Sequence, residues 1–361
     1  MTDRAKVRAE AARLRAAFEA EGAQPVETGI LQPAETLLDL YGEDIRARAY
    51  VTSDALRGEQ MLRPDFTVPV VQMHMEHGAE PACYTYSGEV FRRQENDPDR
   101  ANEYMQVGFE VFERNAPEAA DARVFGLMYK TLAPLGLRAA TGDIGILMAA
   151  VDGLQTTARR KAALRRHIWR PRRFRALIDR FSGRAPVPDS RSALLASDDP
   201  MAEAGPLIGL RSRAEVATRI AALREDAEAA PISENEVALL DAILSVRETC
   251  PNALEHLRDI AVDMPAIRAA VELLERRLEA MQAHGIKVDA LDFEASYGRT
   301  HMEYYDGFVF GFYAEARPDL PPVATGGRYD ALTRQLGQGR EIPAVGGVIR
   351  PGMVVELGGL T

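Results

Sequence analysis

The sequence contains little cysteine and no long apolar run. Its 361 residues include only two cysteines, Cys83 and Cys250. That is too few for a disulfide framework, and no Cys/His cluster has metal-ligand spacing. No apolar stretch approaches the roughly 20 residues that a bilayer span requires, and the first ten residues lack the apolar centre of a secretory signal. We therefore expect a cytoplasmic protein with no membrane association and no metal or other cofactor.

Positive charge is also scarce. The chain has 44 Lys and Arg against 54 Asp and Glu, a formal net charge of -10. Broad binding to a nucleic-acid backbone needs a net basic face, so RNA binding is disfavoured. The basic stretch 158–175 is a local exception. It keeps an RNA-sensing module as an alternative, although a helix that contacts an acidic partner explains the stretch equally well.

Hydrophobic periodicity divides the chain into a β-rich core and a helical insertion. Apolar residues at helical spacing predict a helix over 3–20 and several more between 166 and 285. Elsewhere, short apolar segments bounded by Gly and Pro predict strands with no βαβ rhythm between them. We therefore expect an α+β fold. Residues 1–165 and 286–361 would form one antiparallel sheet flanked by helices, and residues 166–285 a mainly helical insertion.

The segment YSGEVFRRQENDPDRANEYMQVGFEVFE, residues 86–113, reads as a β-hairpin that carries polar residues inside a sheet. Alternation along the second strand directs Gln106, Gly108 and Glu110 to one face and apolar residues to the other. Arg92 lies on the preceding strand. Gly108 leaves room above the sheet, bordered by an amide, a carboxylate and a guanidinium. This pattern predicts a binding pocket. The simpler alternative is a solvated face with an Arg–Glu cross-strand pair.

Five segments resemble one family. LRPDFTVPV, YSGEVFRRQENDPDRANEYMQVGFEVF, EYYDGFVF, GGRYDAL and PAVGGVI occur in the order found in histidyl-tRNA synthetase. They are similar to its substrate loop, its motif 2, its two histidine-specific motifs and the start of its motif 3, over residues 30–350 apart from the insertion. The resemblance implies a class II aminoacyl-tRNA synthetase-like fold whose pocket holds free L-histidine, without the anticodon-binding domain.

The resemblance also implies a set of histidine-binding residues: Asp65, Thr67, Arg92, Gln106, Glu110, Tyr304, Tyr305 and Arg328. The first two would meet the α-amino group of histidine, and the next two its α-carboxylate. Glu110 would meet the imidazole with help from one of the two tyrosines, and Arg328 would lie near the ligand in a Gly-rich wall. This suits the chemistry, because a zwitterion needs an anion and a cation, and an imidazole N–H needs an acceptor.

Each of these assignments has a structural alternative. Asp65 and Thr67 could simply cap the following helix. Asp65 also replaces the family's glutamate, which shortens its reach by one methylene. Tyr304 and Tyr305 would point to opposite faces of a strand, so one of them would belong to the core. Arg328 could instead pair with the aspartate two residues later.

The sequence departs from the family on the ATP side of the pocket. Residues 92–94, Arg-Arg-Gln, replace the Arg-x-Glu of motif 2. Thr300 stands where the family has a catalytic arginine, and Met353 where motif 3 has its arginine. Activation of an amino acid with ATP needs cations on the phosphates. Arg299 could partly substitute, whereas Arg350 precedes a proline and is a poor substitute.

A pocket that keeps its amino-acid side and loses its ATP side is typical of a histidine sensor. In this the sequence resembles the synthetase-like regulatory subunits of ATP phosphoribosyltransferase. That resemblance implies a non-catalytic role in the first step of histidine biosynthesis, with feedback inhibition by histidine. It also implies a hetero-oligomer with the short-form catalytic subunit, a homodimer formed through residues 30–50, and no tRNA binding. The alternative is a shortened synthetase paralogue that still adenylates an amino acid.

The charged loop 93–103 would then need a role other than holding ATP and tRNA. Our hypothesis is that this loop moves when histidine binds and relays occupancy towards the partner. A merely solvated loop is the alternative.

Overall fold

The computed structural model of the chain describes residues 3–41, 45–94, 100–202, 205–206, 208–299 and 304–359. Its strands gather into a large and a small sheet. The large sheet contains β1 (Gln24–Pro25), β5 (Ala82–Phe91), β6 (Glu103–Phe112), β7 (Arg138–Asp143), β8 (Arg247–Thr249), β9 (Asp292–Glu294), β10 (Phe308–Tyr313), β11 (Ala324–Arg328) and β12 (Ala344–Ile349). The small sheet contains β2 (Leu31–Pro33), β3 (Val51–Asp54) and β4 (Gly58–Leu62).

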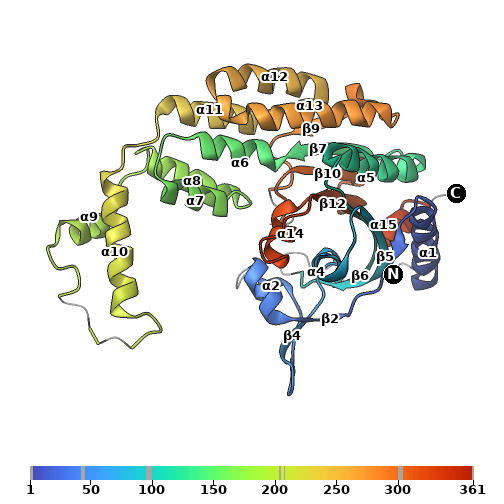
Figure 1. Ribbon diagram of the computed structural model, residues 1–361, viewed down its shortest axis with the longest axis horizontal. Coiled ribbons are helices and arrows are strands. Elements are labelled where there is room, and N and C mark those ends of the chain that lie inside the picture. The colour runs from blue at the N-terminus through green and yellow to red at the C-terminus, as the bar shows by residue number, and fades with distance from the viewer. Residues whose placement is uncertain are drawn as a thin grey trace.

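The large sheet lies in the right half of the molecule as seen in Figure 1. Its strand order is β1-β5-β6-β12-β11-β10-β7-β9-β8. Neighbours from β5 to β7 in this order are antiparallel, whereas β1 pairs with β5 and β7 pairs with β9 in parallel. Strands from both ends of the chain therefore share one sheet. This confirms the predicted α+β arrangement, with parallel pairs added towards the margins.

Helices flank this sheet and make up most of the insertion. They are α1 (Arg4–Ala20), α2 (Ala34–Tyr41), α3 (Ile45–Arg48), α4 (Thr67–His77), α5 (Pro117–Leu132), α6 (Ile144–Gly153), α7 (Ala158–Arg166), α8 (Pro171–Phe181), α9 (Asp189–Ala196), α10 (Arg213–Glu228), α11 (Glu234–Ser245), α12 (Cys250–Asp263), α13 (Arg268–Ala283), α14 (Asp330–Leu336) and α15 (Pro351–Glu356). Short 3-10 helices occur at Ala133–Leu135, Pro265–Ile267 and Val288–Ala290. No helix among these described elements is long and apolar enough to span a membrane.

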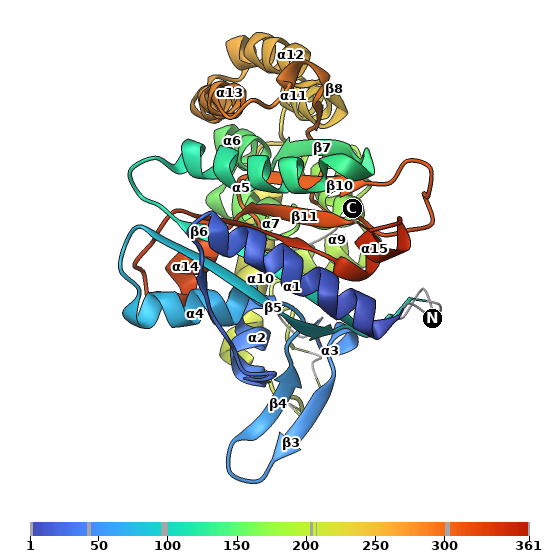
Figure 2. The same ribbon diagram turned by 90° about the vertical axis from the view of Figure 1, so that its right-hand side faces the viewer.

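The apolar core lies between the sheet and helices α1 and α5 (Figure 2). The predicted N-terminal helix is confirmed: Asp3 caps it, and its Leu14 and Phe18 are fully buried. Phe18 meets Phe109 of β6 edge to face, with 5.4 Å between ring centroids. From α5, the ring of Phe125 packs against three aromatic residues of β10: Phe308, Phe310 and Phe312. Burying each such ring contributes roughly 1.5–3 kcal/mol, so this face anchors the sheet.

The opposite face of the sheet is covered by α4 and α14, which pack against one another. His74 of α4 stacks on Phe112 of β6, with ring centroids 3.9 Å apart, and its Nδ1 lies 3.0 Å from the hydroxyl of Tyr84. These contacts hold α4 over the end of the hairpin. The polar residues of the hairpin therefore lie beneath α4 and α14, away from the α1–α5 core.

The predicted insertion is mainly helical and has two parts. Helices α12 and α13 form a layer beyond α5 and α6, while α9 and α10 extend to one side (Figure 1). The strand β8 also falls within the insertion and pairs with β9, so it extends the large sheet. The division of the chain at residues 165 and 285 stays a prediction, since the insertion contributes to the sheet as well as to the helical layer.

The basic stretch 158–175 finds acidic partners inside the chain. Arg160 pairs with Asp226 of α10 at 2.6 Å, and the same carboxylate also receives Arg180 and Arg191. Arg175 pairs with an aspartate of α11. These ion pairs tie α7, α8 and α9 to neighbouring helices. Within the stretch, Arg160 and Arg175 thus have acidic partners in the chain itself.

Candidate ligand-binding site

The predicted polar face of the hairpin lies beneath α4. In the sheet register Gly88 faces Gln106, Tyr86 faces Gly108, and Gly346 of β12 faces Glu110. Because paired residues of antiparallel strands point to the same side, these side chains share one face of the sheet. Val107, Phe109 and Val111 are buried on the other face, as alternation predicts.

Glu110 is the centre of this face and is 1% exposed. Its Oε1 accepts hydrogen bonds from the hydroxyls of Tyr86 at 2.7 Å and Thr67 at 3.2 Å. Its Oε2 accepts one from the hydroxyl of Tyr329 at 2.6 Å. Burial raises the pKa of Glu110 to about 7 although these hydroxyls favour the ionised form, and the nearby charge of Asp65 raises it further. The carboxyl group is therefore fixed in place and can titrate near neutral pH.

The space above Gly108 is filled by the ring of Tyr86. A Cβ at Gly108 would lie 2.0 Å from Cζ of that ring, and the ring stacks on Phe66 with 4.3 Å between centroids. The prediction that Gly108 leaves room for a ligand is therefore wrong, because its missing side chain makes room for Tyr86. A second glycine has a similar role: a Cβ at Gly346 would lie 1.4 Å from Oε2 of Glu110.

Gln106 is the second buried polar residue of this face. It is 1% exposed, and its Oε1 has no hydrogen-bond partner within the described part of the chain. A buried acceptor without a partner is uncommon in folded proteins and costs roughly 1–3 kcal/mol. Such an atom is suited to receive an N–H donor from a ligand.

Tyr304 and Tyr305 lie together beside this face. Their ring centroids are 4.9 Å apart, and the Tyr304 ring is 6.1 Å from that of Tyr329. A Cβ at Gly327 would lie 2.8 Å from Cδ1 of Tyr305, so this ring covers β11 next to Glu110. One of the two, Tyr305, is a buried core residue as expected, whereas Tyr304 is only partly buried. Both residues precede β10, so strand alternation does not apply to them.

The remaining predicted contacts lie around the start of α4. Asp65 is 3% exposed, and its Oδ1 accepts a hydrogen bond from the backbone N–H of Val68 at 3.3 Å. Asp65 therefore contacts the first turn of α4, although the N-cap residue of this helix is Phe66. Thr67 instead directs its hydroxyl to Glu110. Arg92 is half-buried, and its Nε donates to the carbonyl of Pro64 at 2.7 Å, so its guanidinium is anchored close to the aspartate.

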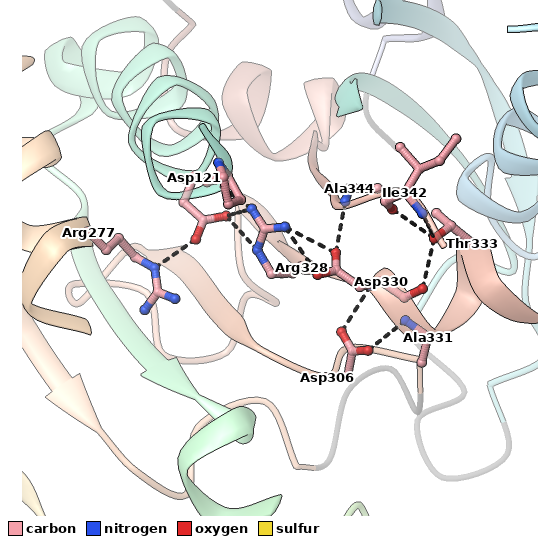
Figure 3. Close-up of polar contacts among 10 residues, drawn as sticks. Asp121, Arg277, Asp306, Arg328, Asp330, Ala331, Thr333, Ile342 and Ala344 are labelled. Atoms are coloured by element: carbon pink, nitrogen blue, oxygen red, sulfur yellow. Dashed lines mark hydrogen bonds and ion pairs between the residues drawn. The ribbon is translucent and has the colours of Figure 1, made fainter. Parts of the chain in front are cut away.

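Arg328 belongs to a different cluster, on the α5 side of the sheet (Figure 3). It faces Val345 in the register, one residue away from the Gly346–Glu110 row. Its Nη2 lies 2.7 Å from a carboxylate oxygen of Asp121, and its Nη1 lies 3.1 Å from Asp330. The alternative pairing with Asp330 is therefore confirmed. This geometry does not support the predicted ligand contact of Arg328, because its donors are used on the opposite face.

The residues at the positions expected to hold ATP in the family make their contacts within the protein. Arg299 is 5% exposed and donates from Nε to the carbonyl of Ile168 at 2.7 Å. Arg350 donates from Nη1 to the carbonyl of Pro322. Met353 lies in α15, and Thr300 falls outside the described residues. Both arginines are thus anchored to backbone carbonyls.

Two residues that contact Glu110 were not foreseen from the sequence, Tyr86 and Tyr329. Each donates its hydroxyl to Glu110. Strand alternation was sufficient to place Tyr86 on the same face as Glu110, but no local pattern distinguishes a hydrogen-bonding tyrosine from a core tyrosine. In sum, this face offers a carboxyl group, an unpaired amide oxygen and a nearby guanidinium among aromatic rings. In the described part of the chain, no group of three His, Cys, Asp or Glu side chains could hold a metal ion.

Comparisons with known proteins agree with this fold. The family model described as histidyl-tRNA synthetase matches residues 2–203 and 210–352. A protein of Brucella anthropi named ATP phosphoribosyltransferase regulatory subunit is 32% identical over 92% of this chain and 93% of its own length. The protein of the same name from Brucella canis is 31% identical, with the same coverage.

Two solved structures share the fold. One is an ATP phosphoribosyltransferase regulatory subunit/histidyl-tRNA synthetase from Bacillus halodurans, with a TM-score of 0.69 and 20% identity over 99% of this chain and 81% of that chain. The other is a histidine–tRNA ligase subunit from Alicyclobacillus acidocaldarius, with a TM-score of 0.61 and 24% identity over 99% and 95%. The chain therefore belongs to the histidyl-tRNA synthetase family and, within it, to the regulatory subunits of ATP phosphoribosyltransferase.

Proposed function

We propose that the chain is a non-catalytic regulatory subunit of ATP phosphoribosyltransferase that binds free histidine on the face around Glu110. The observation that carries the binding proposal is a pair of buried acceptors: the carboxyl group of Glu110 and the unpaired Oε1 of Gln106. Free histidine supplies two kinds of N–H donor, its imidazole and its ammonium group. One ligand can therefore satisfy both acceptors.

The geometry favours one orientation of the ligand. Glu110 accepts the imidazole N–H, since three hydroxyls already orient its oxygens. Gln106 accepts from the α-ammonium group rather than meeting the α-carboxylate, because its unpaired atom is an acceptor. Arg92 lies near Tyr305. Burial raises the pKa of Tyr305, and the positive charge of Arg92 lowers it by a smaller amount. Its guanidinium binds the α-carboxylate, and Asp65 adds negative charge near the ammonium.

The partner in this proposal is the short-form catalytic subunit of ATP phosphoribosyltransferase. Support comes from the names of the relatives, which describe a regulatory subunit. Self-association as a homodimer through the region 30–50 is part of the proposal. Exposed apolar side chains at that region support it, since Ile30 is 45% and Leu31 is 53% exposed. Neighbouring Val51 of the small sheet is 43% exposed.

Absence of aminoacylation chemistry is also proposed. Arg299 and Arg350 donate to backbone carbonyls, and methionine occupies position 353. Phosphoryl and adenylyl transfer depend on cations aimed at the phosphates. A net charge of -10 further disfavours tRNA binding. The competing function is adenylation of histidine, and ATP–pyrophosphate exchange measured with histidine distinguishes the two, because robust exchange would contradict a non-catalytic role.

Titration calorimetry with L-histidine tests the binding proposal. We expect saturable binding by the wild-type chain. The Glu110→Gln variant should bind about 10- to 100-fold more weakly, since a hydrogen bond to a charged group is lost in a buried site. Glu76→Gln is the matched control, because Glu76 is an exposed glutamate on α4. Equal affinity of all three proteins would contradict the proposed site.

A further inference from the structure

The insertion reaches the wall of the candidate site through the turn between α7 and α8. Trp169 lies in this turn, and its indole Nε1 donates a hydrogen bond to the backbone carbonyl of Tyr305 at 3.1 Å. In the reverse direction, Nε of Arg299 donates to the carbonyl of Ile168 at 2.7 Å. The turn therefore donates one hydrogen bond to Tyr305 and accepts one from Arg299. Tyr304 and Tyr305 together are called the tyrosine wall of the site.

Arg299 makes this junction less rigid than a buried ion pair would. Its guanidinium lies 4.9 Å above the ring of Phe174 in α8, and its Nη2 has no hydrogen-bond partner among the described residues. Burial lowers the pKa of Arg299 to about 10, with a further contribution from Arg175. A guanidinium held by one carbonyl and one ring contributes less than one paired with carboxylates.

The other attachment of the insertion is much firmer. Arg277 of α13 lies 2.8 Å from a carboxylate oxygen of Asp121 and 2.8 Å from one of Asp143. Figure 3 shows how Asp121 then joins Arg328. All of these groups are nearly inaccessible to solvent, so breaking this network would leave buried charges unpaired. The insertion is thus fixed at α13 and more weakly attached at the α7–α8 turn.

The wall that Trp169 contacts is connected to Glu110 by short steps. Asp306 follows Tyr305, and its carboxylate accepts from the backbone N–H groups of Asp330 at 3.0 Å and Ala331 at 2.6 Å. Figure 3 shows these contacts at the start of α14. The residue before this helix is Tyr329, whose hydroxyl donates to Glu110. A displacement of Tyr305 would therefore shift Tyr329 and its hydrogen bond to Glu110. A displacement of Glu110 would likewise shift Tyr305.

We propose that Trp169 is a positioning residue for the ligand site, and that the α7–α8 turn of the insertion responds to its occupancy. The proposal rests on the proposed function, since the ligand is histidine. An indole that holds the Tyr305 wall in its binding position raises the affinity for histidine. By linkage, bound histidine stabilises the contact of the turn with the wall. The route from the site to the rest of the assembly then runs through the insertion and does not require the loop 93–103.

The spectroscopic test uses the fact that the sequence contains a single tryptophan. Tryptophan emission of the full-length chain reports the environment of Trp169 alone. We expect a saturable change in this emission during titration with L-histidine, with a midpoint equal to the dissociation constant from calorimetry. Histidine that binds in the calorimeter without changing the emission would overturn this inference but leave the proposed function intact. Absence of calorimetric binding would overturn both.

Substitution of Trp169 tests the role of the indole N–H directly. Trp169→Phe keeps a ring in the turn but removes the donor to Tyr305, so we expect about 5- to 10-fold weaker histidine binding by calorimetry. Trp169→His restores an N–H donor and should recover part of the affinity. Arg172→Gln, an exposed change at the start of α8, is the control and should bind as the wild type does. Unchanged affinity of Trp169→Phe would overturn the proposal, and if that variant does not fold, the wild-type emission titration decides.

Discussion

At the residue scale, Glu110 is a buried carboxyl group whose ionisation the fold resists. Burial raises its pKa from 4.5 to about 7 in the folded chain. Between these two pH values the folded protein binds a proton that the unfolded protein has released. The free energy of unfolding therefore falls as pH rises through this window. The site retains a carboxyl group that stability alone would not favour, as is common for binding sites.

This leads to a prediction about stability. Glu110→Gln removes the ionisable group, so at about pH 8 we expect the free energy of unfolding to rise by roughly 1–3 kcal/mol. At about pH 4.5 the wild-type group is protonated and the difference should largely disappear. Urea unfolding at both pH values measures this. Equal destabilisation of the variant at both would show that Glu110 is a structural hydrogen-bonding residue without an ionisation cost.

Histidine binding should depend on the same ionisation. A carboxylate accepts the imidazole N–H better than a carboxylic acid does, and the ionised fraction of Glu110 becomes about tenfold larger between about pH 6 and pH 8 for a pKa near 7. We expect the affinity of the wild-type chain to rise up to about tenfold over this range. Calorimetry across the range checks it. Tighter binding at the acidic end would mean that the ligand enters as imidazolium.

Strand alternation in the sequence correctly predicted that Gln106 and Glu110 lie on the same polar face, because the hairpin is regular. The same rule does not apply to Tyr304 and Tyr305, which lie in an irregular segment before β10. The prediction for Arg328 failed for a different reason. Its partner Asp121 is 207 residues away in the sequence, and no local pattern indicates so distant a contact.

At the scale of elements, the position of α13 depends on a buried ion-pair network. Arg277 bridges Asp121 of α5 and Asp143 at the end of β7. The periodicity of α13 predicted a helix with one buried face, and Leu274 and Leu278 do lie on that face. It did not predict that an arginine shares this face. Burial of a guanidinium requires carboxylates supplied by other elements, so the tertiary structure decides it.

The network predicts unequal effects for two neighbouring arginines. Arg277→Met would leave Asp121 and Asp143 without this partner, and we expect a loss of about 3–5 kcal/mol in the free energy of unfolding. Arg276→Met removes an exposed pair with Glu118, in which the arginine side chain is 52% exposed, and should cost about 0–1 kcal/mol. Urea unfolding of both variants measures the difference. Similar losses would contradict a special role for the buried network.

At the scale of the whole molecule, the insertion is attached to the core by side chains distant in sequence. Trp169 and Tyr305 are 136 residues apart. Composition indicated the insertion, but the way it touches the candidate site was not predictable. The small sheet lies at the other end of the molecule and projects as the β3–β4 hairpin (Figure 2). Exposed apolar residues at its base are the strongest candidates for a contact between two copies of the chain.

The proposed homodimer can be tested at this base. We expect Leu31→Glu to shift the chain towards monomer in sedimentation velocity, because a buried charge in an apolar interface carries a large desolvation cost. The control is Leu210→Glu, since Leu210 is a fully exposed leucine of the insertion. This variant should sediment as the wild type does. A dimer that survives Leu31→Glu would place the contact elsewhere.

The most direct measurement is the phosphoribosyltransferase activity of the short-form catalytic subunit assembled with this chain, titrated with L-histidine. We predict that the wild-type complex is active and is inhibited at histidine concentrations that match the calorimetric dissociation constant. The complex with Glu110→Gln should assemble and remain active at the same concentrations. Inhibition of that complex equal to the wild type's would contradict a histidine site at Glu110.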